Sequence, residues 1–187
     1  IITRATEDQL IPAKQMTQFT GRLAENKPNI LDEPNDIIHQ SIMMLDLFPQ
    51  ISGFYNGDTK GNLLAIRRVE KDSLYPYSKD QRLPTAAVYE VRTLSRNTSI
   101  TKEFFQYLDA SGNVIAMAER PPATDYYDPR TRPWYMGALE KKASYWSDPY
   151  AFITTRQVGI TATEPVFDSN GAVKIIMSAD ITMGEIS

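Results

Sequence analysis

The chain has 187 residues and a net charge of −3, and it contains no cysteine. Its hydrophobic fraction of 42% and charged fraction of 23% are typical of one globular domain with a core of its own. The small negative charge does not favour binding to nucleic acid or to an anionic membrane surface, and the lack of cysteine excludes disulfides, zinc-thiolate sites and cysteine nucleophiles. No apolar window is long enough to cross a bilayer, and the start of the chain, which has no signal peptide, reads as that of an excised fragment.

Two helices are predicted at the start of the chain. The first covers residues 3–24, where apolar side chains follow roughly helical spacing at Leu10, Ala13, Phe19 and Leu23. Pro12 lies inside this range and predicts a kink or a later start. The second helix opens at Pro34 or Asn35 and closes at Phe48, and one of its faces carries Ile38, Ile42 and Leu45.

Strand patterns begin at about residue 50. They cover residues 51–55, 62–69, 86–94, 103–108, 114–118, 150–154, 159–167 and 173–181. Turn-forming sequences join three pairs of these strands at residues 57–61, 109–112 and 168–171. Residues 70–84 read as a long loop, and residues 132–142 as a short helix. Strands joined by hairpins, with most of the helix at one end of the chain, predict an α+β domain with a mainly antiparallel sheet.

Catalytic motifs are few. The single histidine, His39, reads as a partly exposed residue of the second helix and has no second histidine with which to build a metal site. There is no nucleophile elbow and no phosphate-binding glycine loop. Residues 109–113 share the start of a calcium-loop pattern but lack its later glutamate, so a hairpin turn is expected. We expect no catalysis, metal or cofactor; a hydrolase is a less favoured alternative, because any two acidic residues can meet in a fold.

The most informative segment is residues 126–135, with the sequence YYDPRTRPWY. Arginine presents a rigid fork of donors that matches a carboxylate or phosphate, and Trp and Tyr offer flat apolar faces with one polar edge. Together these side chains predict a pocket wall that binds a small anion. Two local alternatives stay open: Arg132 could form an ion pair with Asp125 or Asp128, and Trp134 could be a core anchor.

Several stretches of the sequence resemble the double Cache (dCache) sensor domains. They are residues 127–135, 137–138, 146–150, 159–161, 165–171 and 179–181. The resemblance follows residues 51–181 in the order of elements and is sharpest from Tyr126 onward. It implies a PAS-like antiparallel sheet, a long N-terminal helix as the spine of the domain, and a small molecule bound in the membrane-distal module.

The resemblance also implies a domain organisation. Residues 1–48 would be the N-terminal helical part and residues 49–187 the membrane-distal module, while the membrane-proximal module of a complete dCache domain is absent from this chain. The native protein would be a membrane-anchored receptor whose sensor lies in the periplasm or outside the cell, and the first helix would offer a surface for homodimer formation. The output domain stays open among a histidine kinase, a chemoreceptor, a nucleotide cyclase and a cyclic-dinucleotide enzyme.

One subset of the family binds amino acids through a motif of six positions, and this sequence resembles it at Tyr127, Arg132, Trp134, Tyr135, Tyr150 and Asp180. The resemblance implies that Arg132 and Trp134 hold the ligand carboxylate. Tyr127, Tyr150 and Asp180 would hold the ammonium group. Tyr135 would shape the pocket. A free amino acid is a zwitterion, so a guanidinium and a carboxylate facing one cavity suit both of its charges.

Alternation along residues 173–181 predicts which face of the last strand meets the ligand. One face carries Asp180 with Ile176 and Ser178, and the other carries Val173, Ile175, Met177 and Ala179. Structural alternatives are that Asp180 belongs to a hydrogen-bond network, that Tyr150 is an ordinary strand residue, and that Arg130 braces its loop.

The identity of the ligand is less determined than its class. A Cache sensor for an organic acid, an amine, a purine or a sugar is the main alternative to an amino-acid sensor. Selectivity for the ligand side chain is expected from residues at the far end of the pocket, with Tyr89, Phe105 and Tyr107 as candidates.

Overall fold

The computed structural model describes residues 4–25, 31, 34–96 and 100–185, and it contains one antiparallel sheet with strand order β5-β4-β3-β2-β1-β9-β8-β6, in which β7 also pairs with β8. The strands are β1 Ile51–Asp58, β2 Leu63–Arg68, β3 Tyr89–Ser95, β4 Lys102–Leu108, β5 Val114–Glu119, β6 Tyr145–Trp146, β7 Tyr150–Ala151, β8 Val158–Phe167 and β9 Val173–Thr182. The helices are α1 Arg4–Glu25, α2 Asn35–Leu47, α3 Pro133–Lys141 and the short 3-10 turns η1 Pro129–Thr131 and η2 Met183–Glu185. This arrangement confirms the predicted α+β fold.

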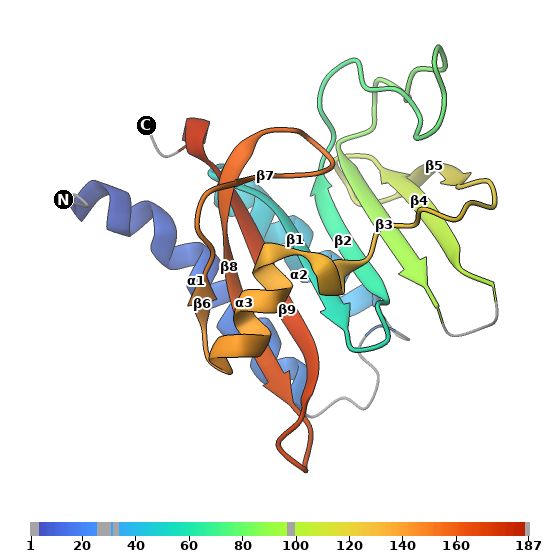
Figure 1. The fold of residues 1–187 in the computed structure, drawn as a ribbon. Coiled ribbons are helices and arrows are strands. Elements are labelled where there is room, and N and C mark those ends of the chain that lie inside the picture. Colours follow the sequence, from blue (N-terminus) through green and yellow to red (C-terminus); the bar gives the residue numbers. More distant parts are fainter. Residues whose placement is uncertain (1–3, 26–30, 32–33, 97–99, 186–187) are drawn as a thin grey trace.

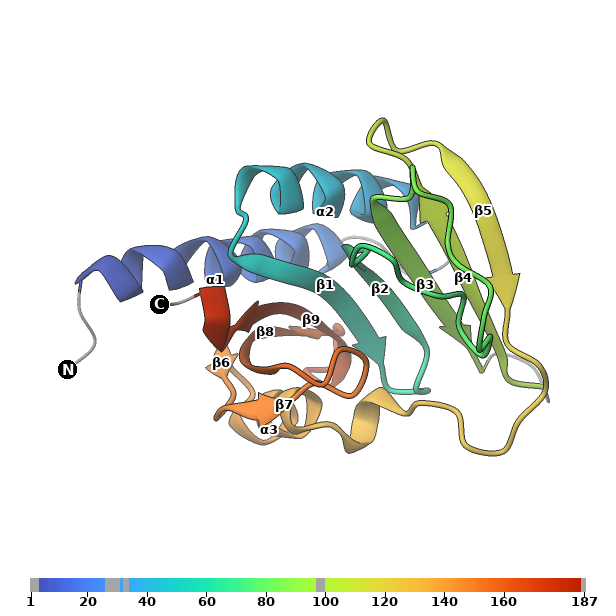
Figure 2. The same cartoon turned by 90° about the horizontal axis from the view of Figure 1, so that it is seen from above.

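The sheet separates two layers of different kinds (Figures 1 and 2). Helices α1 and α2 cover one face, with α1 along β8 and β9 and α2 along β1 and β2. Helix α3 and the connection from β7 to β8 lie on the other face. None of the helices in the described part is long and apolar enough to pass through a bilayer.

Helix α1 runs without interruption through Pro12, so the predicted later start is wrong. Proline removes one backbone hydrogen bond from a helix interior. Ala13, Met16 and Ala24 are buried against the sheet, and this packing holds the helix together across the defect. The predicted first residue of the helix, Thr3, lies outside the described residues.

The main core fills the space between the two long helices and the sheet. From β9 it takes Ile175, Met177, Ala179 and Ile181, as the strand alternation predicts. Ile176 packs on the other face, against α3. Val173 was predicted on the core face but packs with Ile176 instead, because the pairing of β8 with β9 is irregular between Val173 and Ile175. Strand β9 therefore packs against the long helices on one face and against α3 on the other.

The three predicted hairpins and the long loop over residues 70–84 are present. The strand predicted over residues 150–154 is shorter, since only Tyr150 and Ala151 pair with β8 and the chain then turns. Strand β6 was not predicted. Its two residues pair with β8, so it depends on a partner distant in sequence and not on a local pattern.

Candidate ligand-binding site

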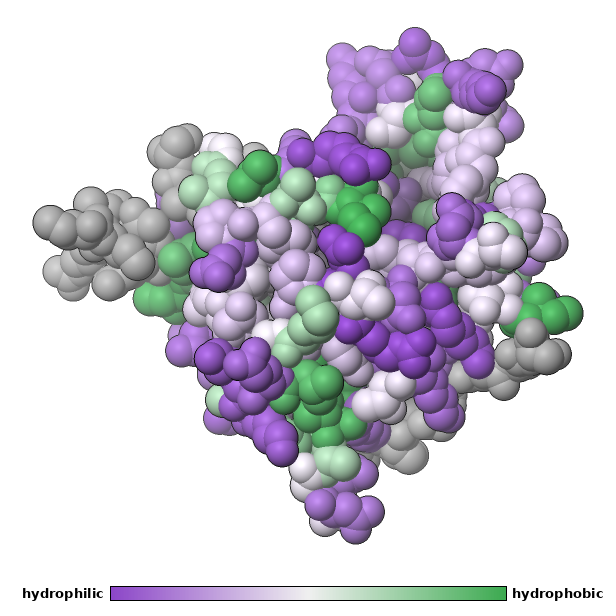
Figure 3. Space-filling model, viewed as in Figure 1, coloured by the Kyte–Doolittle hydropathy of each residue, from purple (hydrophilic) through white to green (hydrophobic). Residues whose placement is uncertain are grey.

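A cavity of ≈ 70 Å³ lies on the α3 face of the sheet, and we call it the head cavity. Its wall is formed by Tyr55, Leu63, Ala65, Arg92, Tyr127, Arg132, Trp134, Tyr150, Phe152, Ile153, Thr154 and Asp180. Five of the six residues singled out from the sequence are among them, and Tyr135 is not. Figure 3 shows this face of the molecule, where hydrophilic surface predominates around the hollow between the β7–β8 connection and strands β2 and β3.

The turn before α3 fixes where Arg132 stands. The Asp128 side chain accepts a hydrogen bond from the Arg130 backbone N–H, which caps η1. The Arg130 guanidinium bonds the same carboxylate at 2.7 Å and reaches the Thr59 carbonyl at 3.4 Å, so Arg130 braces the loop as expected. Pro133 then starts α3 at a position where the missing N–H costs nothing.

The Arg132 guanidinium makes no hydrogen bond or ion pair with any described residue. Its two alternative partners are occupied elsewhere, because Asp128 pairs with Arg130 at 2.7 Å and Asp125 with Arg120 at 2.7 Å. The local salt bridge considered from the sequence is therefore not formed. Arg132 lies half-buried on the cavity wall with its donors available.

Asp180 stands on the cavity wall with one carboxylate oxygen engaged. Its Oδ1 accepts hydrogen bonds from Thr161 Oγ1 at 2.6 Å and from the Tyr55 hydroxyl. Its Oδ2 has no hydrogen-bond partner among the described residues. Burial raises the pKa of Asp180 to about 7, although the hydrogen bonds from Thr161 and Tyr55 act in the opposite direction. A nearby cation would lower this pKa again by favouring the ionised form.

Tyrosine hydroxyls surround this carboxylate. Tyr150 and Thr161 are hydrogen-bonded through their hydroxyls at 2.8 Å, and the Tyr150 ring meets Phe152 edge-on with centroids 5.2 Å apart. Burial raises the pKa of Tyr55, Tyr127 and Tyr150, so all three hydroxyls stay protonated at neutral pH. Tyr150 is therefore both a strand residue and part of the Asp180 network.

Trp134 is a core residue and a wall residue at the same time. Only 1% of it is exposed, and its ring meets Tyr55 at 5.0 Å and Tyr135 at 5.5 Å, both edge-on. Its indole Nε1 donates to the Tyr127 hydroxyl at 3.4 Å. Tyr135 lies behind this indole, so it supports Trp134 and does not line the cavity.

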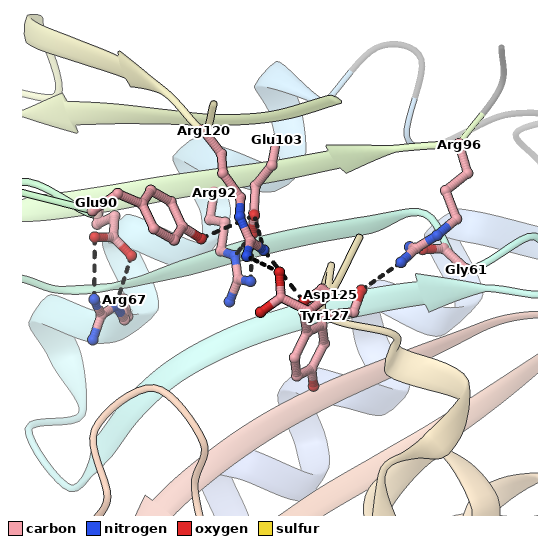
Figure 4. Close-up of polar contacts among 10 residues, drawn as sticks. Gly61, Arg67, Glu90, Arg92, Arg96, Glu103, Arg120, Asp125 and Tyr127 are labelled. Carbon is pink, nitrogen blue, oxygen red and sulfur yellow. Dashed lines mark hydrogen bonds and ion pairs between the residues drawn. The ribbon is translucent and has the colours of Figure 1, made fainter. Parts of the chain in front are cut away.

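Tyr127 is held by two arginines, one on β3 and one just after its end (Figure 4). The Arg92 guanidinium lies 5.0 Å from the centre of the Tyr127 ring and donates from Nε to the fully buried Glu103 at 2.5 Å. Arg96 donates to the Tyr127 carbonyl at 2.6 Å and to the Gly61 carbonyl. These contacts fix both the ring and the backbone of Tyr127.

Tyr55 and Arg92 are the two polar aromatic or charged residues among the wall residues that sequence reasoning missed. They stand in one row across the sheet, because Tyr55 pairs with Ala65 and Ala65 pairs with Arg92. Strand β3 also carries Glu90 and Thr93, so the charge of Arg92 did not set it apart in the sequence. His39 is exposed on α2, on the opposite side of the sheet from the cavity.

Residues 29–187 match the family of methyl-accepting chemotaxis protein-like, first PDC sensor domains. The chain belongs to this family. It is therefore a sensor domain, and the resemblance to dCache-type sensors is confirmed. Adenylate cyclase 1 of Rhizobium meliloti is 34% identical over 141 residues, which are 74% of this chain and 20% of that protein.

Two solved structures have a similar fold. The ligand-binding domain of the Campylobacter jejuni chemoreceptor Tlp3 in complex with L-valine gives a TM-score of 0.55 at 15% identity, over 97% of this chain and 56% of that one. The sensory domain of the same receptor with isoleucine gives 0.56 at 15% identity, over 97% and 55%. The chain thus spans a fifth of the cyclase and just over half of the chemoreceptor domains.

Proposed function

We propose that this sensor domain binds a small L-amino acid outside the cytoplasm, as the input module of a transmembrane receptor. Arg132 and Trp134 hold the carboxylate of the ligand. Tyr127, Tyr150 and Asp180 hold its ammonium group. The observation that carries the proposal is that Arg132 and Asp180, from distant parts of the chain, line one cavity and each keep unused hydrogen-bonding capacity toward it.

The energetics of buried charge favour a zwitterion over a ligand of a single charge. A buried cation or anion is stable only when it is paired, and neither Arg132 nor Asp180 has a counter-charge of its own in the described part of the chain. An ammonium group at Asp180 also meets the faces and hydroxyls of the surrounding tyrosines, where a cation gains roughly 0.5–2 kcal/mol from an aromatic ring. One amino acid satisfies both ends of the cavity.

The relatives support the class of ligand and the type of protein. The chemoreceptor domains of similar fold are described in complex with L-valine and with isoleucine, which are amino acids. The partial match to a cyclase supports an attached output domain, to which ligand binding is transmitted by a shift between two arrangements of the sheet and α1. The domain itself carries no catalysis, and residues 49–187 form the membrane-distal module behind the helical part, residues 1–48.

A titration of the purified domain with each of the twenty L-amino acids tests the proposal. We expect at least one of them to bind with a micromolar dissociation constant, about −8 kcal/mol, and to raise the melting temperature. The absence of any binding or thermal stabilisation across the whole set would contradict an amino-acid sensor.

An organic acid is the second candidate, and one observation favours it. Arg92 adds another guanidinium to the cavity wall, and the Asp180 pKa of about 7 allows this carboxylate to stay protonated beside a second anion. Titration of each amino acid beside its analogue without the amino group separates the two candidates, because only an acid site binds the analogue equally well.

Dimer formation through α1 stays a proposal as well. Phe19 and Leu23 of this helix are 52% and 37% exposed. These two apolar side chains lie outside the face that packs on the sheet, so they are available to a second copy. Sedimentation of the wild type and of a Phe19→Ser variant, with and without ligand, measures whether this surface joins two copies.

A further inference from the structure

A second and larger cavity lies beside the head cavity and shares part of its wall. Its volume is ≈ 250 Å³, against ≈ 70 Å³ for the head cavity, and we call it the side-chain cavity. The two share the wall residues Tyr55, Ala65, Phe152, Thr154 and Asp180. The head cavity alone is small, since a water molecule occupies about 30 Å³ in the liquid and ligand pockets usually hold about 300–1,000 Å³.

One row of residues across the sheet contributes a glycine, Gly53, to the wall of the side-chain cavity. Strand pairing places Asp180, Gly53, Arg67 and Glu90 next to one another on β9, β1, β2 and β3. Neighbouring strands lie about 4.8 Å apart, so Asp180 and Arg67 are separated by roughly two such spacings. Gly53 has no side chain to fill the space between them, and Ala65 beside it is small. A ligand anchored at Asp180 therefore has room in the direction of Arg67.

Arg67 presents a free donor at the end of this space. Its Nε and Nη2 bond both oxygens of the buried Glu90 at 2.8 and 3.1 Å, and Figure 4 shows the two side chains facing each other in this way. Its Nη1 has no hydrogen-bond partner among the described residues, and the side chain keeps 29% of its surface exposed on the cavity wall. The guanidinium is thus held in place by one carboxylate and still has N–H groups to offer.

The charge balance of this cavity favours an uncharged group. Glu90 already neutralises Arg67, and the exposed Glu70 on the same wall repels a second carboxylate. Arg68 also lies on this wall, but its guanidinium donates to the backbone carbonyls of Pro49 and Ile51. A cation would meet the Arg67 guanidinium itself. The wall of the cavity is mixed. Pro49, Ala65 and Phe152 offer apolar surface to the methylene groups of a ligand side chain, while an apolar end group would leave the polar groups of the wall without partners. These groups are Ser52, Thr154, Thr155, Gln157 and Thr182.

We propose that the ligand is an L-amino acid with a long, uncharged side chain that ends in a carboxamide, for which glutamine is the chemical probe. Its side chain runs from Asp180 over Gly53, and its carbonyl oxygen accepts a hydrogen bond from Nη1 of Arg67. This assignment rests on the proposed function, because the zwitterionic head must first be held at Arg132 and Asp180.

Calorimetric titrations of the wild-type domain with glutamine, alanine, norleucine, glutamate and lysine test the assignment. We expect glutamine to bind about tenfold more tightly than each of the others, the factor that one hydrogen bond to a charged group provides. Norleucine or glutamate binding as tightly as glutamine, or lysine doing so, would overturn the carboxamide assignment. Failure of all five ligands would instead count against the proposed function.

The Arg67→Lys variant tests whether Arg67 causes the preference for glutamine. Lysine keeps a cation for Glu90 but cannot donate in two directions as the guanidinium fork does. The preference for glutamine over alanine should fall to less than about threefold, while the affinity for alanine stays unchanged. An intact preference in a folded Arg67→Lys domain would refute the role of Arg67; if the variant does not fold, the wild-type comparison of glutamine with norleucine decides the question alone.

Discussion

The two faces of the sheet differ in what they bury. The face under α1 and α2 is apolar and continuous, and the residues that β9 contributes to it, such as Ile175 and Ile181, are almost fully buried. The face under α3 carries guanidinium, carboxylate and phenol groups around two cavities with a shared wall. Asp180 and Ile181 are neighbours in sequence and belong to opposite faces.

This difference separates stability from recognition on a single set of strands. The apolar face gives the domain its stability, and polar groups on it, such as the Tyr89 hydroxyl, are bonded within the fold. The other face keeps unpaired polar groups, which are costly when buried and become useful when a ligand satisfies them. Substitutions on the two faces should therefore produce opposite combinations of changes in stability and in ligand affinity.

The largest effect is expected for Leu45→Ala on the apolar face. Leu45 is fully buried between α2 and the sheet, and truncation of a buried leucine costs about 2–5 kcal/mol through lost burial and the cavity left behind. Urea denaturation gives the free energy of unfolding, and calorimetry at a temperature where the variant is folded gives the affinity. A change of more than about threefold in affinity would contradict the separation of stability from recognition between the two faces.

Arg132→Ala and Asp180→Ala should show the reverse pattern. Each should weaken amino-acid binding by about 100-fold or more, roughly 3 kcal/mol, because each leaves one charge of the zwitterion unpaired in the cavity. The melting temperature without ligand should change little. Arg130→Lys is the matched control in the same segment, since it keeps the pair with Asp128, and it should bind as the wild type does. Normal binding by either alanine variant would refute the assigned site.

The affinity for an amino acid should depend on pH through Asp180. Its pKa of about 7 means that the free site is partly protonated at neutral pH, whereas the ammonium group requires the ionised carboxylate. Affinity should therefore rise with pH up to about 7.5 and fall by up to tenfold for each unit below 7. Titrations at pH 5.5, 6.5 and 7.5 measure this slope. Asp180→Asn should bind weakly and show no such slope.

The stability of the ligand-free domain should show a change of similar size per pH unit with the opposite sign. Asp180 has a folded pKa of about 7 against a reference of 3.8, so between these values the folded state holds a proton that the unfolded state releases. Its contribution to stability is full below pH 4 and is lost as pH rises to 7, with a slope of at most about 1.4 kcal/mol per unit. Urea midpoints of the wild type and Asp180→Asn across this range measure the difference. Parallel curves would show that Asp180 is not buried enough to act in this way.

The sequence predicts the hairpins and the helices well because their signals are local. Turn sequences such as residues 168–171 fix which strands are neighbours, and alternation along β9 places Asp180 on the ligand face. The row of Tyr55, Ala65 and Arg92 could not be predicted in this way. It depends on the order of β1, β2 and β3 and on their register, which are properties of the whole sheet.

The expected selectivity residues illustrate the same limit. Tyr89 lies on the apolar face and donates to Asp46, while Phe105 and Tyr107 belong to a separate cluster beside the loop of residues 70–84. None of the three lines the head cavity or the side-chain cavity. Large aromatic side chains are conspicuous in a sequence, whereas the wall of the side-chain cavity includes a glycine and an alanine, which are not.

The central claim is that one cavity binds both charges of a zwitterion. Its most direct test is a calorimetric titration of the wild type and of Asp180→Asn with the amino acid that binds best among the twenty and with its analogue lacking the amino group. We predict that the wild type prefers the amino acid by about 100-fold or more and that Asp180→Asn loses most of this preference. Equal binding of the two compounds by the wild type, or an unchanged preference in Asp180→Asn, would contradict the claim.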